Sequence, residues 1–84
     1  MTPDGPHETI LTFEYSSAER ARRVRRALEP EVGDIEDDRS EVRLTQDDMR
    51  VEVHVFASDL VALRASLNTW LSLVTVAEQA GDAC

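Results

Sequence analysis

The residues that could carry out chemistry in this sequence are few and widely separated. His7 and His54 have no third metal ligand at a suitable spacing, and the single cysteine is Cys84, so no metal site is predicted. The three glycines are too far apart to form a phosphate-binding loop. Two acidic pairs, Asp37-Asp38 and Asp47-Asp48, fall in predicted loops, where solvated charge is far more common than a general acid–base pair. We therefore predict that the protein is not an enzyme and needs no cofactor.

The charge balance limits the class of partner. The 84 residues include 17 Asp and Glu and nine basic residues, all of them arginine, which gives a net charge of −8. A protein that binds nucleic acid by itself is usually basic, since attraction to phosphates dominates its affinity, so this composition argues against such a function. An acidic excess without lysine is typical of proteins from salt-in halophilic archaea. High-GC codon usage in an ordinary bacterium is the alternative explanation.

Five of the nine arginines lie together between positions 20 and 26, with only Glu19 and Glu29 as acidic neighbours. One interpretation is a solvated helix face whose arginines offset the helix dipole and the surrounding acids. The alternative is a docking patch for an acidic protein or for RNA phosphate, because a guanidinium binds such groups through paired hydrogen bonds. The candidate contacts for this patch are Arg22, Arg23, Arg25 and Arg26.

The periodicity of apolar and polar residues predicts strands and helices in the order β-α-β-β-α, and these elements position the candidate residues. Alternating apolar and polar residues predict strands over 7–15, 39–45 and 50–57. The polar residues 46–49 predict a hairpin turn between the last two strands. The expected fold is a single α+β domain over 1–84, with a three-stranded antiparallel sheet and two helices on one face. Residues 1–6 are expected to form a loose lead-in, and residues 81–84 a C-terminal tail.

Both helices carry recognisable end signals. The first helix is expected to begin with a capping box, in which Ser16 and Glu19 close the first turn, and to end before Pro30. The second is expected to begin at the Asp59 cap and to end at Gly81. Its apolar sequence is interrupted by polar residues, so we predict a helix of a globular domain in the cytoplasm and not a membrane span.

The second predicted helix has two apolar faces. The bulkier one is expected to pack on the sheet and consists of Leu60, Leu63, Leu67, Trp70, Leu71, Val74 and Ala77. The other is built of smaller residues, which allow another helix to approach closely. The first helix would cover part of this second face, and a partner protein the remainder. The partner interface is therefore predicted at Val61, Ala65, Thr69, Leu73 and Val76.

A polar seam lies between these two faces of the second helix. Arg64 and Asn68 are four residues apart and share one side of the helix. If both neighbouring faces are buried, this pair is partly desolvated and needs hydrogen-bond partners, either Asp59 with nearby carbonyls or a partner chain. The alternative is a pair that faces solvent and adds no stability.

The outward face of the predicted sheet suggests self-association. A sheet of three strands has two unpaired edges, which natural proteins protect, and its outer face carries apolar residues among charged ones. We predict a homodimer, with candidate dimer contacts at Ile10, Arg43, His54 and Phe56.

Several short motifs carry a resemblance to a known family. Ala57-Ser58-Asp59 precedes the run Leu63-Arg64-Ala65-Ser66-Leu67-Asn68-Thr69-Trp70-Leu71, and Arg39-Ser40 opens the second strand. Together with the β-α-β-β-α order, these residues resemble the small dimerising (Pcc-type) subunit of the archaeal KEOPS (EKC) complex. The likeness extends from the first strand to Glu78. Position 69 is often serine in that family, so Thr69 is a departure that keeps the hydroxyl.

The resemblance implies a non-catalytic scaffold subunit. Family members form homodimers and bind the threonylcarbamoyltransferase subunit, which modifies the adenosine beside the anticodon of certain tRNAs. A kinase/ATPase subunit and a further small subunit complete the assembly, so contact with tRNA would be indirect or weak. The competing hypothesis is a stand-alone RNA-binding module of KH-like topology. That module needs a GXXG loop to clamp the RNA backbone, and this sequence contains none.

Overall fold

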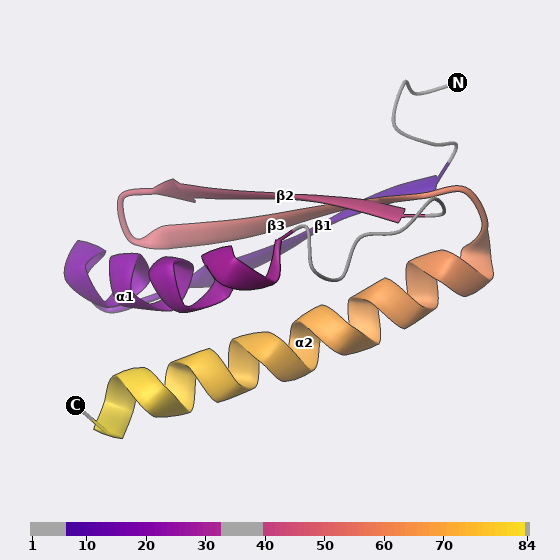
Figure 1. Ribbon diagram of the computed structural model, residues 1–84. Coiled ribbons are helices and arrows are strands. Elements are labelled where there is room, and N and C mark those ends of the chain that lie inside the picture. The colour runs from indigo at the N-terminus through magenta and orange to yellow at the C-terminus, as the bar shows by residue number, and fades with distance from the viewer. Residues whose placement is uncertain (1–6, 33–39, 84) are drawn as a thin grey trace.

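The computed structural model describes residues 7–32 and 40–83, without the side chains of 81–83. The predicted lead-in at 1–6 and most of the acidic loop therefore lie outside the described residues. In chain order the elements are β1 (His7–Glu14), α1 (Ala18–Leu28), the short 3-10 helix η1 (Glu29–Glu31), β2 (Ser40–Asp47), β3 (Arg50–Ala57) and α2 (Leu60–Ala83). Both helices lie on the same side of the sheet (Figure 1). The predicted α+β fold is confirmed.

The three strands form an antiparallel sheet in the order β1-β3-β2, so β3 is central and the other two strands are edges. The hairpin between β2 and β3 is tighter than predicted, because only Asp48 and Met49 separate the strands. Asp48 adopts a left-handed φ of 56°, which aspartate tolerates better than most residues and which permits so short a turn. The Tyr15 N–H donates to the Met49 carbonyl at 2.9 Å and ties the end of β1 to this turn.

Helix α1 starts one residue later than the predicted capping box. Ser17, not Ser16, is the N-cap, and its hydroxyl accepts from the Arg20 N–H at 3.1 Å. With the cap at Ser17, Arg20 takes the third helical position. Glu19 then cannot close the box and pairs instead with Arg23 at 2.9 Å. The predicted end before Pro30 is confirmed, since α1 finishes at Leu28.

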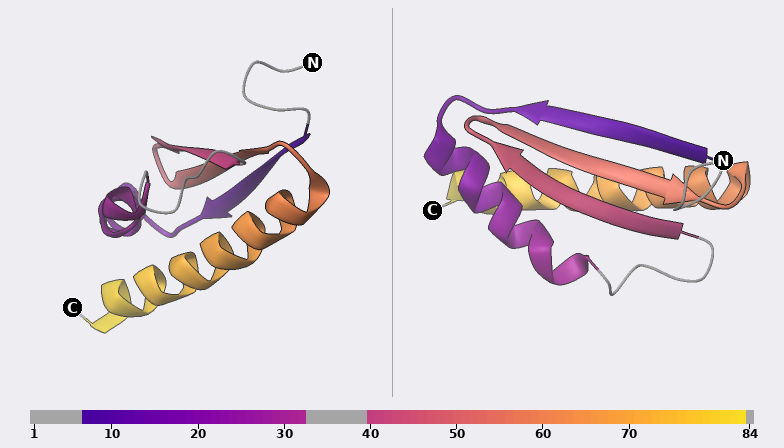
Figure 2. Two further views of the ribbon diagram at one scale, coloured as in Figure 1. Left: turned by 45° about the vertical axis from the view of Figure 1, so that its right-hand side comes forward. Right: turned by 90° about the horizontal axis from the view of Figure 1, so that it is seen from above.

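The core lies between the sheet and the two helices. α1 contributes Val24 and Leu28, the sheet contributes valines from β2 and β3, and α2 contributes Trp70, Val74 and Ala77. Trp70 is the largest fully buried side chain. The two helices run at an angle to each other beneath the strands, with α1 under the β2 side (Figure 2). Because α2 lies mainly under β3, the side of β1 away from β3 has less cover.

The predicted cap of α2 is confirmed, because the Asp59 carboxylate accepts from the Ala62 N–H at 2.7 Å. The predicted end at Gly81 is wrong, since α2 continues to Ala83, and residues 81–83 belong to the helix and not to a tail. Glycine adopts right-handed helical angles as readily as left-handed ones, so it ends a helix only where the following chain turns away.

The set of α2 residues that face the sheet also differs from the prediction at the edges of that face. Leu60 and Leu71 are 52% and 45% exposed, whereas Ala62 and Ser66 are buried. The helix is rotated so that the bulky Trp70 ring lies at the centre of the contact. The buried face of α2 is therefore displaced from the predicted sheet-facing side, which included Leu60 and Leu71.

By length and composition alone, residues 60–80 of α2 could cross a membrane, with a mean hydropathy of 1.4 and 28% of the stretch buried. The core helix of a globular protein passes the same test. Here Trp70 and Val74 pack against the sheet and α1, so we assign this side of α2 to the core. The remaining side is exposed and carries both apolar and polar residues.

A hydrogen bond that the sequence did not predict fixes α2 against the end of β1. The Tyr15 hydroxyl donates to Glu78 at 2.8 Å. Burial and the neighbouring Glu78 raise the pKa of the Tyr15 hydroxyl well above its ordinary value near 10. The stability linked to this raised pKa is complete below about pH 10 and is lost as the pH rises further.

We expect Tyr15→Phe to lower the free energy of unfolding by about 1–2 kcal/mol at pH 7, the range for a partly buried hydrogen bond to a charged acceptor. Urea denaturation followed by circular dichroism measures this loss. Between pH 9 and 11 the wild type should lose stability more steeply than the variant. Equal pH profiles would show that the hydroxyl contributes nothing.

Candidate protein-interaction surfaces

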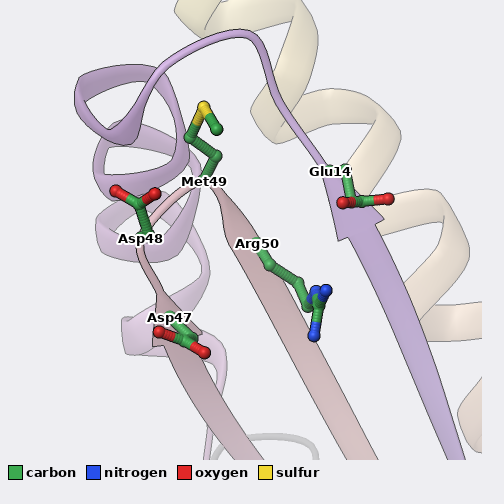
Figure 3. Close-up of a pocket in the computed structure, with 5 residues that line it drawn as sticks. All are labelled: Glu14, Asp47, Asp48, Met49 and Arg50. Atoms are coloured by element: carbon green, nitrogen blue, oxygen red, sulfur yellow. The ribbon is translucent and has the colours of Figure 1, made fainter.

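An open depression of about 310 Å³ lies at the hairpin end of the sheet. Figure 3 shows its lining, in which Arg50 lies between the acidic residues of the neighbouring strands. The register places Arg50 opposite both Glu14 and Asp47, so the arginine offsets the local negative charge. The depression is thus lined by exposed charged groups and Met49.

The two histidines are not brought together into a metal site. His7 is at the start of β1, opposite Ala57, whereas His54 is in the middle of β3 with its Nε2 3.2 Å from Glu8. In the part of the chain that the structure describes, no three histidine, cysteine or acidic residues are grouped to hold a metal ion.

The four predicted dimer contacts do lie together on the outer face of the sheet. Ile10 and Arg43 flank His54 from the two edge strands. The Phe56 ring lies 4.1 Å from the His54 ring and 5.1 Å from the Arg43 guanidinium. Phe56 is only 4% exposed, because neighbours in its own chain cover it. Of the four, Ile10 is the one exposed large apolar side chain, which leaves little apolar surface for a face-to-face contact.

The structure divides the arginines of α1 into two groups. Arg25 is half-buried, donates to Gln46 at 2.9 Å and pairs with Glu29. It therefore ties α1 to β2. Arg22, Arg23 and Arg26 are exposed. The predicted patch for RNA phosphate or an acidic partner is thus reduced to these three side chains, one of which is paired with Glu19.

The exposed side of α2 carries most of the predicted partner interface. Val61 and Val76 are 68% and 62% exposed, and Ala65 and Thr69 are also exposed. We call these four residues the outer stripe. Leu73 is different, because it is half-buried and packs against the core. The outer stripe is a row of small and β-branched side chains, which suits a closely packed helix.

The polar seam of α2 faces solvent in the isolated chain. Arg64 and Asn68 are both exposed, and the Asp59 carboxylate caps the helix. Within the described residues no acceptor for the Arg64 guanidinium is found, and we expect a partner protein to supply one.

We therefore expect Arg64→Ala to leave the melting temperature unchanged and to weaken binding of a partner protein on α2 roughly ten- to a hundredfold, as for a lost charge-assisted hydrogen bond. Thermal melting and isothermal titration calorimetry separate the two effects. A large drop in melting temperature would contradict the exposed position of Arg64.

The comparisons with known proteins agree with this architecture. A family model described as Transcription factor Pcc1 matches residues 8–82, which is nearly the whole chain. The chain belongs to the Pcc1 family. A similar solved structure is a chain from the crystal structure of the binary complex Gon7-Pcc1, with a TM-score of 0.82 and 16% identity. The match covers 93% of this chain and 95% of that one, and at this identity it shows a shared fold. No curated protein matches the sequence.

Two features of the structure could not be predicted from the sequence. The exposed Leu60 and Leu71 were assigned to the core, although their position at the edge of the helical wheel was a warning. The Tyr15–Glu78 hydrogen bond joins residues 63 positions apart, so no local sequence pattern predicts it. Both features depend on how α2 is rotated against the sheet.

Proposed function

We propose that this chain is a non-catalytic scaffold subunit of a KEOPS-type tRNA-modifying complex. The observation that carries the proposal is the exposed outer stripe of α2 in a chain of the Pcc1 family. Val61 and Val76 lie outside the chain's own core, and apolar residues gathered on one exposed side of a helix are a feature of partner-binding surfaces. The resemblance of the Leu63–Leu71 run to the small KEOPS subunit supports the threonylcarbamoyltransferase subunit as that partner.

The outer stripe is suited to a helix of the transferase subunit. Ala65 and Thr69 have small side chains and lie in the middle of the stripe, and Val61 and Val76 lie at its two ends. Helix axes can approach to about 8–10 Å over such residues. Arg64, beside the stripe, would then become partly buried and donate to an acceptor on the partner.

Self-association and cytoplasmic location complete the proposal. Two copies would place two transferase subunits around one centre, and the kinase/ATPase subunit would belong to the same assembly. The net charge of −8 makes strong binding of nucleic acid by this chain alone unfavourable. A role in transcription, which the name of the family model suggests, would therefore need a second protein to contact DNA.

The test is affinity purification of the tagged chain from the cells that naturally produce it, at high salt. Recovery of the transferase and kinase subunits is the expected result. A tagged Val76→Asp variant, which places a charge on the outer stripe, serves as the matched control and should lose both. Recovery of RNA in their place would favour the RNA-binding hypothesis, and equal recovery with the variant would show that the stripe is not the docking site.

A further inference from the structure

We propose that the hydrogen bond between Tyr15 and Glu78 positions the C-terminal part of α2 for partner binding, which makes Tyr15 a positioning residue of the docking surface. This role rests on the proposed function, because it takes the outer stripe as the place where the transferase subunit binds. Tyr15 follows β1 and does not belong to the outer stripe, so its effect on a partner would be transmitted through the helix.

The C-terminal part of α2 is held by few contacts. Among the side chains described after Trp70, only Val74 and Ala77 are buried, and those after Glu78 are exposed. The last turn has no basic residue to offset the helix dipole, and it includes Gly81, a residue type that lowers helix stability. The local sequence thus does little to hold this end of the helix, and contacts with other elements have to do so.

Three elements and the hairpin turn meet at Tyr15. Its hydroxyl donates to Glu78 of α2 at 2.8 Å, and its backbone N–H donates to the Met49 carbonyl of the turn at 2.9 Å. The Arg20 guanidinium, in the first turn of α1, lies 5.9 Å from the centre of its ring. The C-terminal end of α2 lies at this same end of the sheet (Figure 1). Because the turn fixes the Tyr15 backbone, the hydroxyl is a firm point of attachment for α2.

The attachment and the docking surface lie on opposite sides of the helix. Successive residues of a helix are rotated by about 100°, so Val76 and Glu78 are about 200° apart around the axis. Val76 is 62% exposed and forms the C-terminal end of the outer stripe. The hydrogen bond therefore holds this turn of α2 from the β1 side, fixes the direction in which Val76 projects, and leaves the stripe uncovered.

Loss of the hydrogen bond would let the last turns of α2 open locally, while Trp70 keeps the middle of the helix packed. A partner that docks on Val76 would then have to order these turns as it binds, and the lost conformational entropy weakens binding. We expect the affinity to fall about tenfold, the equilibrium equivalent of one hydrogen bond to a charged group.

The first test is amide hydrogen exchange of the isolated chain, followed by NMR. In Tyr15→Phe the amides of residues 76–80 should exchange about tenfold faster than in the wild type, whereas Glu78→Gln, which keeps an acceptor oxygen, should stay within about threefold. Val42→Ala is the control, because it removes buried bulk from β2 away from the hairpin turn. It should leave exchange at 76–80 unchanged. Circular dichroism checks that each variant is folded.

The second test is calorimetric titration of the same variants with the purified transferase subunit. Tyr15→Phe and Glu78→Ala should each weaken binding about tenfold, and the double variant no further, because both remove the same bond. Glu78→Gln and Val42→Ala should bind like the wild type. Wild-type affinity in Tyr15→Phe, or an equal loss in Val42→Ala, overturns the positioning role.

The two tests also separate this role from the proposed function. A wild type that does not bind the transferase subunit overturns the proposed function, and the role in docking falls with it. Unchanged exchange at 76–80 in Tyr15→Phe overturns the positioning role alone, whatever the wild type binds.

Discussion

Replacing Trp70 by alanine should lower the free energy of unfolding by about 3–5 kcal/mol, the range for removing a large buried aromatic side chain. Trp70 is fully buried and contacts the core from the middle of α2. A chain of 84 residues has a total stability of about 4–12 kcal/mol, so Trp70→Ala would remove much or all of it. Chemical denaturation followed by circular dichroism measures the change, since the variant has no tryptophan fluorescence.

Two further variants make this prediction specific. Within the described residues the Trp70 Nε1 has no acceptor, so Trp70→Phe removes an unpaired buried donor along with part of the ring. It should therefore cost less than half as much as Trp70→Ala. Thr69→Ala, next to it on the exposed side, should change the stability by no more than about 0.5 kcal/mol. Similar losses for Trp70→Ala and Thr69→Ala would contradict the orientation of α2.

The second large effect concerns the proposed binding of a transferase subunit. Ala65→Trp and Val76→Asp should each weaken binding at least about 100-fold, because bulk or an unpaired charge obstructs a closely packed helix. Both positions are exposed, so the melting temperature of the isolated chain should stay within a few degrees of the wild type. Calorimetric titration with the purified transferase subunit measures the affinity.

Leu73→Asp is not an equivalent test, although the sequence placed Leu73 in the same interface. Its half-buried side chain packs against the core, so an aspartate there would destabilise the fold itself. Thr45→Trp introduces the same side chain at an exposed position on the outer sheet face and is the control for Ala65→Trp. If Thr45→Trp weakened transferase binding as much as Ala65→Trp, the docking site would lie elsewhere.

Most of the fold could be predicted from local patterns. Alternation in β1, β2 and β3 and the caps of the helices depend on residues within a few positions of one another, so the chain order of elements followed directly. The errors were at the ends of elements. Ser17 and not Ser16 is the N-cap of α1, and α2 extends past Gly81. Either of two neighbouring serines can cap a helix, and a single glycine can end a helix or continue it, at similar energy.

The surfaces were less predictable than the fold. A helical wheel correctly placed Trp70, Val74 and the outer stripe, but it assigned Leu60 and Leu71 to the core and Leu73 to the interface. A wheel gives angles between residues, and the rotation of the helix against the sheet is set by packing of the largest side chain and by contacts such as Tyr15–Glu78. Those contacts join distant parts of the chain.

The sequence by itself determined the α+β class, the number and order of elements and the acidic character of this Pcc1-family protein. Periodicity depends on residues that are close in the sequence, and composition is a sum over all residues, so neither requires knowledge of the packing. Only the tertiary structure decided which side of α2 is exposed, that Arg25 ties α1 to β2 while three other arginines face solvent, and that Phe56 is covered by its own neighbours. Each of these depends on residues that meet only when the sheet and helices pack, and packing selects among faces that the sequence alone leaves equivalent.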